Sequence, residues 1–297
     1  MLSELMDFLS ERGIEFKTAV PMSKYTTFRI GGNADIMIFP RTVQDVSLVV
    51  AELKRENIRR ITVGNGSNLL VDDDGIRGAV IKTSLIDFVS VNGCEITAGA
   101  GCLNSKVANA ALDASLTGME FAHGIPGSIG GAVFMNAGAY SGTFADIVVE
   151  TVYVDADGNI RSVKGEEHDF GYRHSCFTPD DVICETKLVL RRGNKDEIRA
   201  EMQSLIEKRK ASQPLEYPSA GSFFKRPTGY FAGKLIQDSG LKGVSVGGAR
   251  VSEKHAGFII NTGDATCRDV DGLRELVQKT VYEKFGVMLE PEVKRIK

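Results

Sequence analysis

A serine set among glycine, aromatic rings and two cations is the stretch of this sequence best suited to chemistry. Gly221 precedes Ser222, and its missing side chain lets the backbone bend or a ligand approach. Two phenylalanines follow that can be buried and fix this backbone, and the Lys225-Arg226 pair brings positive charge within reach of an anion. A hydroxyl needs such surroundings before it can give up a proton. The stretch indicates a catalytic serine; the alternative is a plain glycine-serine turn in a hairpin.

Two glycine-rich loops are candidates for binding phosphate. Glycine lets backbone N–H groups converge on an oxyanion, and serine and asparagine add side-chain donors. Neither loop continues into Gly-Lys-Ser/Thr or has Gly-x-Gly-x-x-Gly spacing, which disfavours a P-loop NTPase and a Rossmann nicotinamide domain. Two donor-rich loops favour a dinucleotide-sized ligand, with tight turns as the alternative. The loops are Gly64, Asn65, Gly66, Ser67 and Asn68, and Gly124, Ile125, Pro126, Gly127, Ser128, Ile129, Gly130 and Gly131.

An arginine and a glutamate elsewhere could serve the same chemistry. Tyr172 and Arg173 place a permanently charged guanidinium beside an aromatic hydroxyl. Strand alternation sends Glu290 and Glu292 to one side of an extended terminal segment. Taken singly, each is more simply a surface residue. The histidines stand at no metal-ligand spacing with a cysteine or carboxylate, so we expect no metal site.

Hydrophobic periodicity predicts the elements that must position these residues. Strands are expected at 25–32, 36–40, 61–63, 79–81, 95–97, 148–154, 183–190 and 256–261, and an extended piece at 287–293. Helices are expected after the caps Ser3, Thr42, Asn104 and Thr266, with Gly118 closing the third, and another helix carries Ile198, Met202, Leu205 and Ile206. The first third therefore reads as a βαβ-type unit. A charged break at 191–196 marks the main domain boundary.

Composition limits the function classes. A length of 297 residues suits roughly two domains, and a net charge of −3 argues against a nucleic-acid partner held by a basic surface. The five cysteines are odd in number and irregularly spaced, which is typical of reduced thiols in the cytoplasm. Acidic residues interrupt the N-terminus early, and no apolar run is long enough to span a bilayer, so we expect a cytoplasmic protein without a membrane partner.

Together these segments resemble one family, the UDP-N-acetylenolpyruvoylglucosamine reductases of bacterial cell-wall synthesis. The matching segments occur in the family's order along nearly the whole chain: 26–32, 64–68, 124–131, 136–140, 172–175, 220–225 and 290–293. The resemblance implies an α+β chain with a non-Rossmann FAD-binding fold of the vanillyl-alcohol-oxidase (PCMH) type. Two FAD-binding subdomains (1–82 and 83–193) would precede an α+β substrate-binding domain (194–297).

The resemblance also implies a reaction in peptidoglycan precursor synthesis. NADPH would reduce non-covalently bound FAD, and hydride from flavin N5 would then convert UDP-N-acetylglucosamine enolpyruvate to UDP-N-acetylmuramate. Ser222 matches the family's proton donor, and Arg173 and Glu292 match the pair that stabilises the enolic intermediate. Tyr172, Lys225, Arg226 and His255 match substrate-contacting positions. The FAD-binding positions are Arg29, Gly31, Gly64, Asn65, Gly66, Ser67, Asn68, Gly124, Ile125, Pro126, Gly127, Ser128, Gly130 and Gly131. No obligate protein partner is expected.

Two features depart from the family pattern. Arg226 stands where many relatives carry asparagine, and the segment 240–257 is too short for the substrate-covering tyrosine loop, so the chain resembles the shorter branch. Two other functions remain open: an FAD-dependent alcohol or lactone oxidase on the same fold, and a non-catalytic binder of flavin or nucleotide sugar. Neither needs a proton donor such as Ser222.

Overall fold

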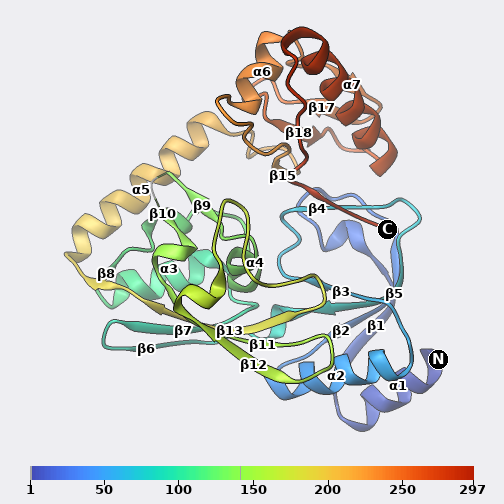
Figure 1. Ribbon diagram of the computed structural model, residues 1–297, viewed down its shortest axis with the longest axis vertical. Coiled ribbons are helices and arrows are strands. Elements are labelled where there is room, and N and C mark those ends of the chain that lie inside the picture. The colour runs from blue at the N-terminus through green and yellow to red at the C-terminus, as the bar shows by residue number, and fades with distance from the viewer. Residues whose placement is uncertain (1, 141) are drawn as a thin grey trace. The chain divides into compact units, whose positions relative to one another are not determined.

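Helices and strands alternate along the whole chain in the computed structural model, which describes residues 2–140 and 142–297 (Figure 1). The chain divides into two compact units. The first comprises Met1–Thr18, Asp35–Asn65 and Gly78–Lys208, and the second Ala19–Ala34, Gly66–Arg77 and Arg209–Lys297. Two N-terminal segments thus belong to the second unit. The three-part division at 82 and 193 stays a prediction.

The first unit contains most of the elements, and four of them, β1, β2, β5 and α5, have end residues that are assigned to the second unit. Its helices are α1 (Leu2–Glu11), α2 (Val43–Arg55), α3 (Asn104–Asp113), α4 (Ile129–Phe134) and α5 (Lys195–Ser212). Its strands are β1 (Glu15–Pro21), β2 (Asn33–Phe39), β3 (Arg60–Val63), β5 (Ile76–Lys82), β6 (Val89–Asn92), β7 (Glu95–Gly99), β8 (Leu116–Thr117), β9 (Gly138–Ala139), β10 (Gly142–Thr143), β11 (Val148–Val154), β12 (Ile160–Lys164), β13 (Val182–Val189) and β14 (Arg191–Arg192).

Two sheets organise this unit. One has the order β1-β2-β5-β3, with β3 and β5 parallel, and α1 and α2 pack together against it (Figure 1). The other is antiparallel, in the order β12-β11-β13-β7-β6, and packs with α3 and α4 around a second core. Helix α2 begins with the predicted capping box, in which the Thr42 side chain accepts from the Asp45 N–H. The parallel pair places the ends of β3 and β5, and the loops that follow them, at one edge.

The second unit is built around a four-stranded antiparallel sheet and one long helix. Its elements are β4 (Leu69–Val71), β15 (Ser219–Ser222), α6 (Ala232–Asp238), β16 (Ser245–Val246), β17 (Ala249–Val251), β18 (Phe258–Asn261), α7 (Cys267–Phe285) and β19 (Lys294–Ile296). The sheet order is β15-β18-β17-β16, and β4 pairs in parallel with β19. Phe28, Ile30 and Leu70, from the two N-terminal segments, are buried in the same core as α6 and α7.

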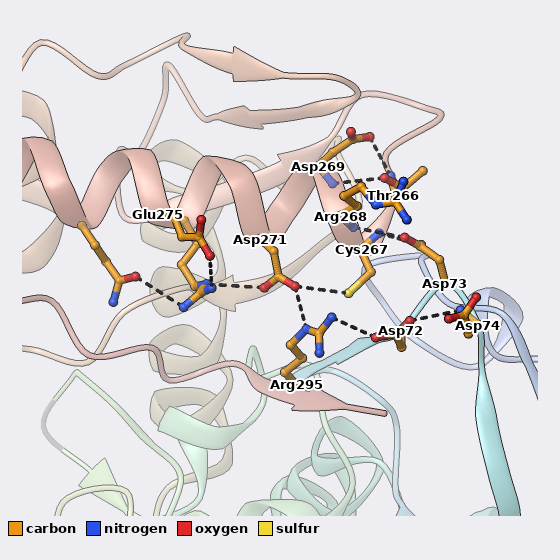
Figure 2. Close-up of polar contacts among 12 residues, drawn as sticks. Asp72, Asp73, Asp74, Thr266, Cys267, Arg268, Asp269, Asp271, Glu275 and Arg295 are labelled. Carbon is orange, nitrogen blue, oxygen red and sulfur yellow. Dashed lines mark hydrogen bonds and ion pairs between the residues drawn. The ribbon is translucent and has the colours of Figure 1, made fainter.

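A polar network holds the segment around β4 to α7 and β19 (Figure 2). The Asp73 carboxylate accepts from the N–H groups of Cys267 (2.7 Å) and Arg268 (3.1 Å), and so caps the start of α7. The Arg295 guanidinium donates to Asp271 (2.6 Å) and Asp72 (2.8 Å). Each of these carboxylates accepts hydrogen bonds from donors within the second unit. We call the six residues the Asp73 network: Asp72, Asp73, Cys267, Arg268, Asp271 and Arg295.

Several predicted elements differ from those observed. Residues 25–32 form a loop, because Arg29 adopts a φ of +56° and its N–H turns back to the Thr26 carbonyl (3.2 Å). Phe28 and Ile30, whose alternation with polar residues predicted a strand, are instead buried from this loop. Helix α3 is not capped by Asn104, which is its first residue, and it ends before Ser115 rather than at Gly118. Strand β5 lies between β2 and β3, so these two strands are not neighbours. The final strand lies at Lys294–Ile296, after the predicted extended piece.

Candidate active site

The second glycine loop leads into α4 and is packed too closely at Gly130 for a larger residue. The Gly130 N–H donates to the Ala100 carbonyl (2.9 Å), and a Cβ on Gly130 would lie 2.8 Å from the Ala100 Cβ. Ser128, just before the helix, is 2% exposed, and its hydroxyl has no hydrogen-bond partner among the described residues. Close packing explains why residue 130 is glycine. Packing does not explain the Ser128 hydroxyl, which can donate and accept a hydrogen bond and is nevertheless buried without a partner among the described residues.

The two predicted phosphate loops approach each other within the first unit. A Cβ on Gly64 would collide with the Ser128 hydroxyl and lie 3.9 Å from the Gly131 nitrogen. Gly64 is therefore required because it faces Ser128. The Lys82 ammonium donates to the Gly64 carbonyl from the end of β5. We call Gly64, Lys82 and Ser128 the Gly64 cluster. The cluster brings a hydroxyl and an ammonium to a glycine that has no room for even a methyl group on its Ser128 side, and these two polar groups suit the phosphates of FAD.

From Gly66 onward, the first loop belongs to the second unit. Gly66 has a φ of +65°, and its carbonyl accepts from the Thr27 N–H (3.1 Å). Asn68 accepts from the Lys294 N–H (2.9 Å) and donates through its side chain to the Glu292 carbonyl (3.3 Å). The loop is thus anchored on the segment that carries Glu292 and leads into β19. Gly31, another predicted FAD contact, has a φ of +129° and no room for a Cβ beside Val71.

Arg173 occupies a tight turn in the first unit. Gly171 and His174 form an antiparallel bridge around Tyr172 and Arg173, and Arg173 has a φ of +55°. The buried Asn136 donates to the Gly171 carbonyl (2.9 Å) and accepts from the Ala145 N–H (2.9 Å). A positive φ at a non-glycine residue is uncommon and is maintained by the surrounding structure. Asn136, which no sequence prediction gave a role, therefore holds the turn that presents Arg173.

Ser222 and Glu292 lie on neighbouring segments of the second unit. Ser222 ends β15 at a bulge that follows Gly221 (φ +79°), and it is exposed. The Glu292 N–H donates to the Phe223 carbonyl (2.8 Å), one residue beyond Ser222. The structure thus brings these two predicted catalytic residues to adjacent backbone positions. Arg173 belongs to the first unit.

The remaining predicted substrate contacts have local partners. Lys225 forms an ion pair with Glu290, and its N–H donates to the Glu290 carbonyl (2.8 Å). The Arg226 guanidinium lies 4.0 Å from the centroid of the exposed Phe231 ring. The pKa of His255 is lowered, chiefly by burial, and its Nδ1 accepts from the Gly257 N–H (3.1 Å). His255 is thus a neutral ring that supports the bend before β18.

The part of the chain that the structure describes contains neither a cluster of metal-ligand side chains nor a helix suited to a membrane. No group of three or more histidine, cysteine or acidic side chains there could hold a metal ion. No helix within residues 2–140 and 142–297 is both long and apolar enough to cross a membrane.

Comparison with known proteins identifies the class first. Residues 34–164 match a family described as an FAD binding domain. Berberine bridge enzyme from Eschscholzia californica has a similar fold, with a TM-score of 0.50 at 15% identity over 64% of this chain and 44% of that chain. That likeness bears on the fold alone. The chain is an FAD-dependent oxidoreductase with the predicted α+β fold of the vanillyl-alcohol-oxidase type.

The C-terminal part identifies the family. Residues 213–296 match the C-terminal domain of UDP-N-acetylenolpyruvoylglucosamine reductase. Proteins of that name from Caldanaerobacter subterraneus and Clostridium novyi are 50% and 48% identical, over 92% and 94% of this chain and 91% and 92% of theirs. The crystal structure of the reductase from Thermus caldophilus has a TM-score of 0.82 at 34% identity, covering 96% of this chain and 99% of that one. The chain belongs to the UDP-N-acetylenolpyruvoylglucosamine reductase family, as predicted.

Proposed function

We propose that this protein uses NADPH and bound FAD to reduce UDP-N-acetylglucosamine enolpyruvate to UDP-N-acetylmuramate, a precursor of peptidoglycan. The observation that carries the proposal is the placement of Ser222 and Glu292 on hydrogen-bonded neighbouring segments, in a chain whose relatives bear the reductase name. A nucleotide-sugar substrate and NADPH also suit the predicted cytoplasmic location.

The Gly64 cluster and the glycine loops would hold FAD non-covalently. When bound, FAD supplies hydride: it accepts one from NADPH and delivers one to the enolpyruvyl group. Two observations fit this cofactor: Gly64 closely approaches Ser128, and the Ser128 hydroxyl has no hydrogen-bond partner among the described residues. Tyr172, Lys225, Arg226 and His255 remain proposed contacts for the substrate.

Each proposed catalytic residue would have one task in the reduction of the substrate. Hydride addition to the β-carbon of an enolpyruvyl ether moves negative charge toward the carboxylate side, and the α-carbon then needs a proton. Ser222 is exposed and would give that proton from its Oγ. Arg173 would hold the developing charge as a fixed cation. Glu292 would hydrogen-bond to the enol, because an ionised carboxylate facing an enolate would oppose the reaction.

The test separates the two half-reactions in Ser222→Ala. Under anaerobic conditions, NADPH should reduce the flavin at the wild-type rate, because this step needs no proton from Ser222. Return of the oxidised flavin spectrum after addition of the enolpyruvyl substrate should slow by about 10²- to 10⁴-fold, the usual contribution of a positioned proton donor. Ser219→Ala, three residues earlier on β15, is the matched control and should behave like wild type.

Other outcomes would select the alternatives. Undiminished reoxidation in Ser222→Ala would remove Ser222 from the mechanism. Wild-type flavin that stays reduced until air is admitted would indicate an oxidase. Wild-type flavin that NADPH does not reduce would support a binding protein.

A further inference from the structure

Lys82 is a buried lysine that the sequence predictions did not single out. It ends β5, where it stands opposite Val63, the last residue of β3. It is 8% exposed, and its ammonium donates to the Gly64 carbonyl. No carboxylate of the described residues forms an ion pair with it. Burial therefore lowers the pKa of Lys82 to about 8, since nothing nearby offsets the loss of hydration.

Ser128 supplies a second, independent observation at the same place. Its hydroxyl is buried and has no partner among the described residues, although it lies where the Cβ of any larger residue at position 64 would be. A buried hydroxyl without a partner is unfavourable and is rare in native structures. Two polar groups with unmet hydrogen-bonding capacity, one of them cationic, thus converge on one glycine.

A purely structural role explains only part of this arrangement. Lys82 could serve to tether the Gly64 loop, which would account for one of its three N–H donors. That role leaves the other donors and the Ser128 hydroxyl unexplained. An anion bound to both groups would satisfy them, and the lack of a side chain at Gly64 lets the loop approach the Ser128 hydroxyl closely. The anion that FAD carries in every redox state is its diphosphate.

We propose that Lys82 and Ser128 together bind a phosphate of the FAD diphosphate beside Gly64. Ser128 was already a predicted FAD contact, whereas Lys82 is new, and the pairing gives each a defined task. The proposal rests on FAD as the cofactor, but it does not depend on which substrate the reduced enzyme uses.

The test compares Lys82→Met, Lys82→Arg and Ser128→Ala with wild type, using flavin-free protein titrated with FAD. Lys82→Met keeps the length of the side chain and removes the charge, and should weaken FAD binding by about 10- to 100-fold. Ser128→Ala should weaken binding by about three- to tenfold. Lys82→Arg retains the charge and should bind better than Lys82→Met.

Two further readouts separate the proposal from its rivals. The melting temperature of flavin-free Lys82→Met should equal or exceed that of wild type, because an uncompensated buried charge is removed; a lowered melting temperature with unchanged FAD affinity would show a loop tether instead. The reduction potential of the FAD-saturated variant should equal that of wild type, because the diphosphate keeps its charge on reduction. A shifted potential would place Lys82 at the flavin ring and overturn the proposal.

Wild-type FAD affinity in Lys82→Met would also overturn it. These measurements use no enolpyruvyl substrate, so failure of the proposed function and failure of this inference would be distinguishable.

Discussion

The Gly64 cluster and the Asp73 network contain similar groups in opposite conditions. In the Asp73 network, the carboxylates of Asp72 and Asp73 meet N–H donors and Arg295 within the second unit (Figure 2). In the Gly64 cluster, a buried ammonium has no carboxylate partner and a buried hydroxyl has no hydrogen-bond partner among the described residues. The first arrangement is complete as it stands, which is typical of groups that stabilise a fold. The second has unmet hydrogen-bonding capacity, which is typical of a ligand site and which the proposed anion would satisfy.

The largest expected effect comes from adding a methyl group at Gly64. Gly64→Ala should lower the free energy of unfolding of the flavin-free protein by about 1–3 kcal/mol, because the new Cβ collides with the Ser128 hydroxyl. It should also abolish measurable FAD binding. Chemical denaturation and FAD titration check these two results.

A second substitution sharpens this test. Adding Ser128→Ala to Gly64→Ala removes the hydroxyl and leaves the Ser128 Cβ 3.6 Å away, an ordinary contact. Stability should recover while FAD binding stays lost. Equal instability of the single and double variants would show that the clash lies elsewhere.

A smaller effect is expected in the Asp73 network. Asp73→Ala should lower the free energy of unfolding by about 1 kcal/mol, the usual size of a lost helix cap, because two N–H groups at the start of α7 lose their acceptor. FAD affinity should not change. The neighbouring exposed Asp74, whose side chain caps no helix, is the control; Asp74→Ala should melt like wild type. Weakened FAD binding in Asp73→Ala would break the contrast between the two regions.

The smallest expected effect is a pH dependence of FAD binding. The ammonium form of Lys82 binds the phosphate, and its pKa in the flavin-free protein is about 8, so affinity should be constant at lower pH and fall as pH rises through 8. The fall should be about threefold between pH 7.5 and 8.5. Burial lowers the pKa of His123, so that histidine titrates below this window.

Two variants check the origin of this effect by titration at several pH values. Lys82→Arg should show no such fall, because arginine stays charged. Lys82→Met should be flat at its lower affinity. A wild-type slope that persists in Lys82→Met would assign the titration to another group.

Local rules explain which parts of the fold could be predicted from the sequence. The capping boxes at Thr42 and Thr266 involve residues three apart, so their helices were predicted correctly. Residues 25–32 follow the same alternation as a strand, yet they form a loop because Phe28 and Ile30 enter a core made mainly by residues beyond 209. A pattern within eight residues carries no information about that distant core.

The candidate active site, like the fold, could be predicted only in part from the sequence. Glycine loops are visible in a sequence, and so is the family likeness that assigned Ser222, Arg173 and Glu292 their proposed roles. Lys82 looks like one more residue at the end of a strand. Its importance depends on three segments, near residues 64, 82 and 128, that meet only in the folded first unit. Likewise, Asn136 gains its role only beside the turn at Gly171.

The pairing of β4 with β19 has a consequence for how the chain matures during synthesis. Lys294–Ile296 complete a sheet begun at Leu69–Val71, so the second unit cannot be completed until residues 294–296 have left the ribosome. Until then Phe28, Ile30 and Leu70 lack their core partners. Contacts between such distant residues fold slowly and leave apolar surface exposed meanwhile. The nascent protein should therefore depend on chaperones most strongly in the interval before residues 294–296 emerge.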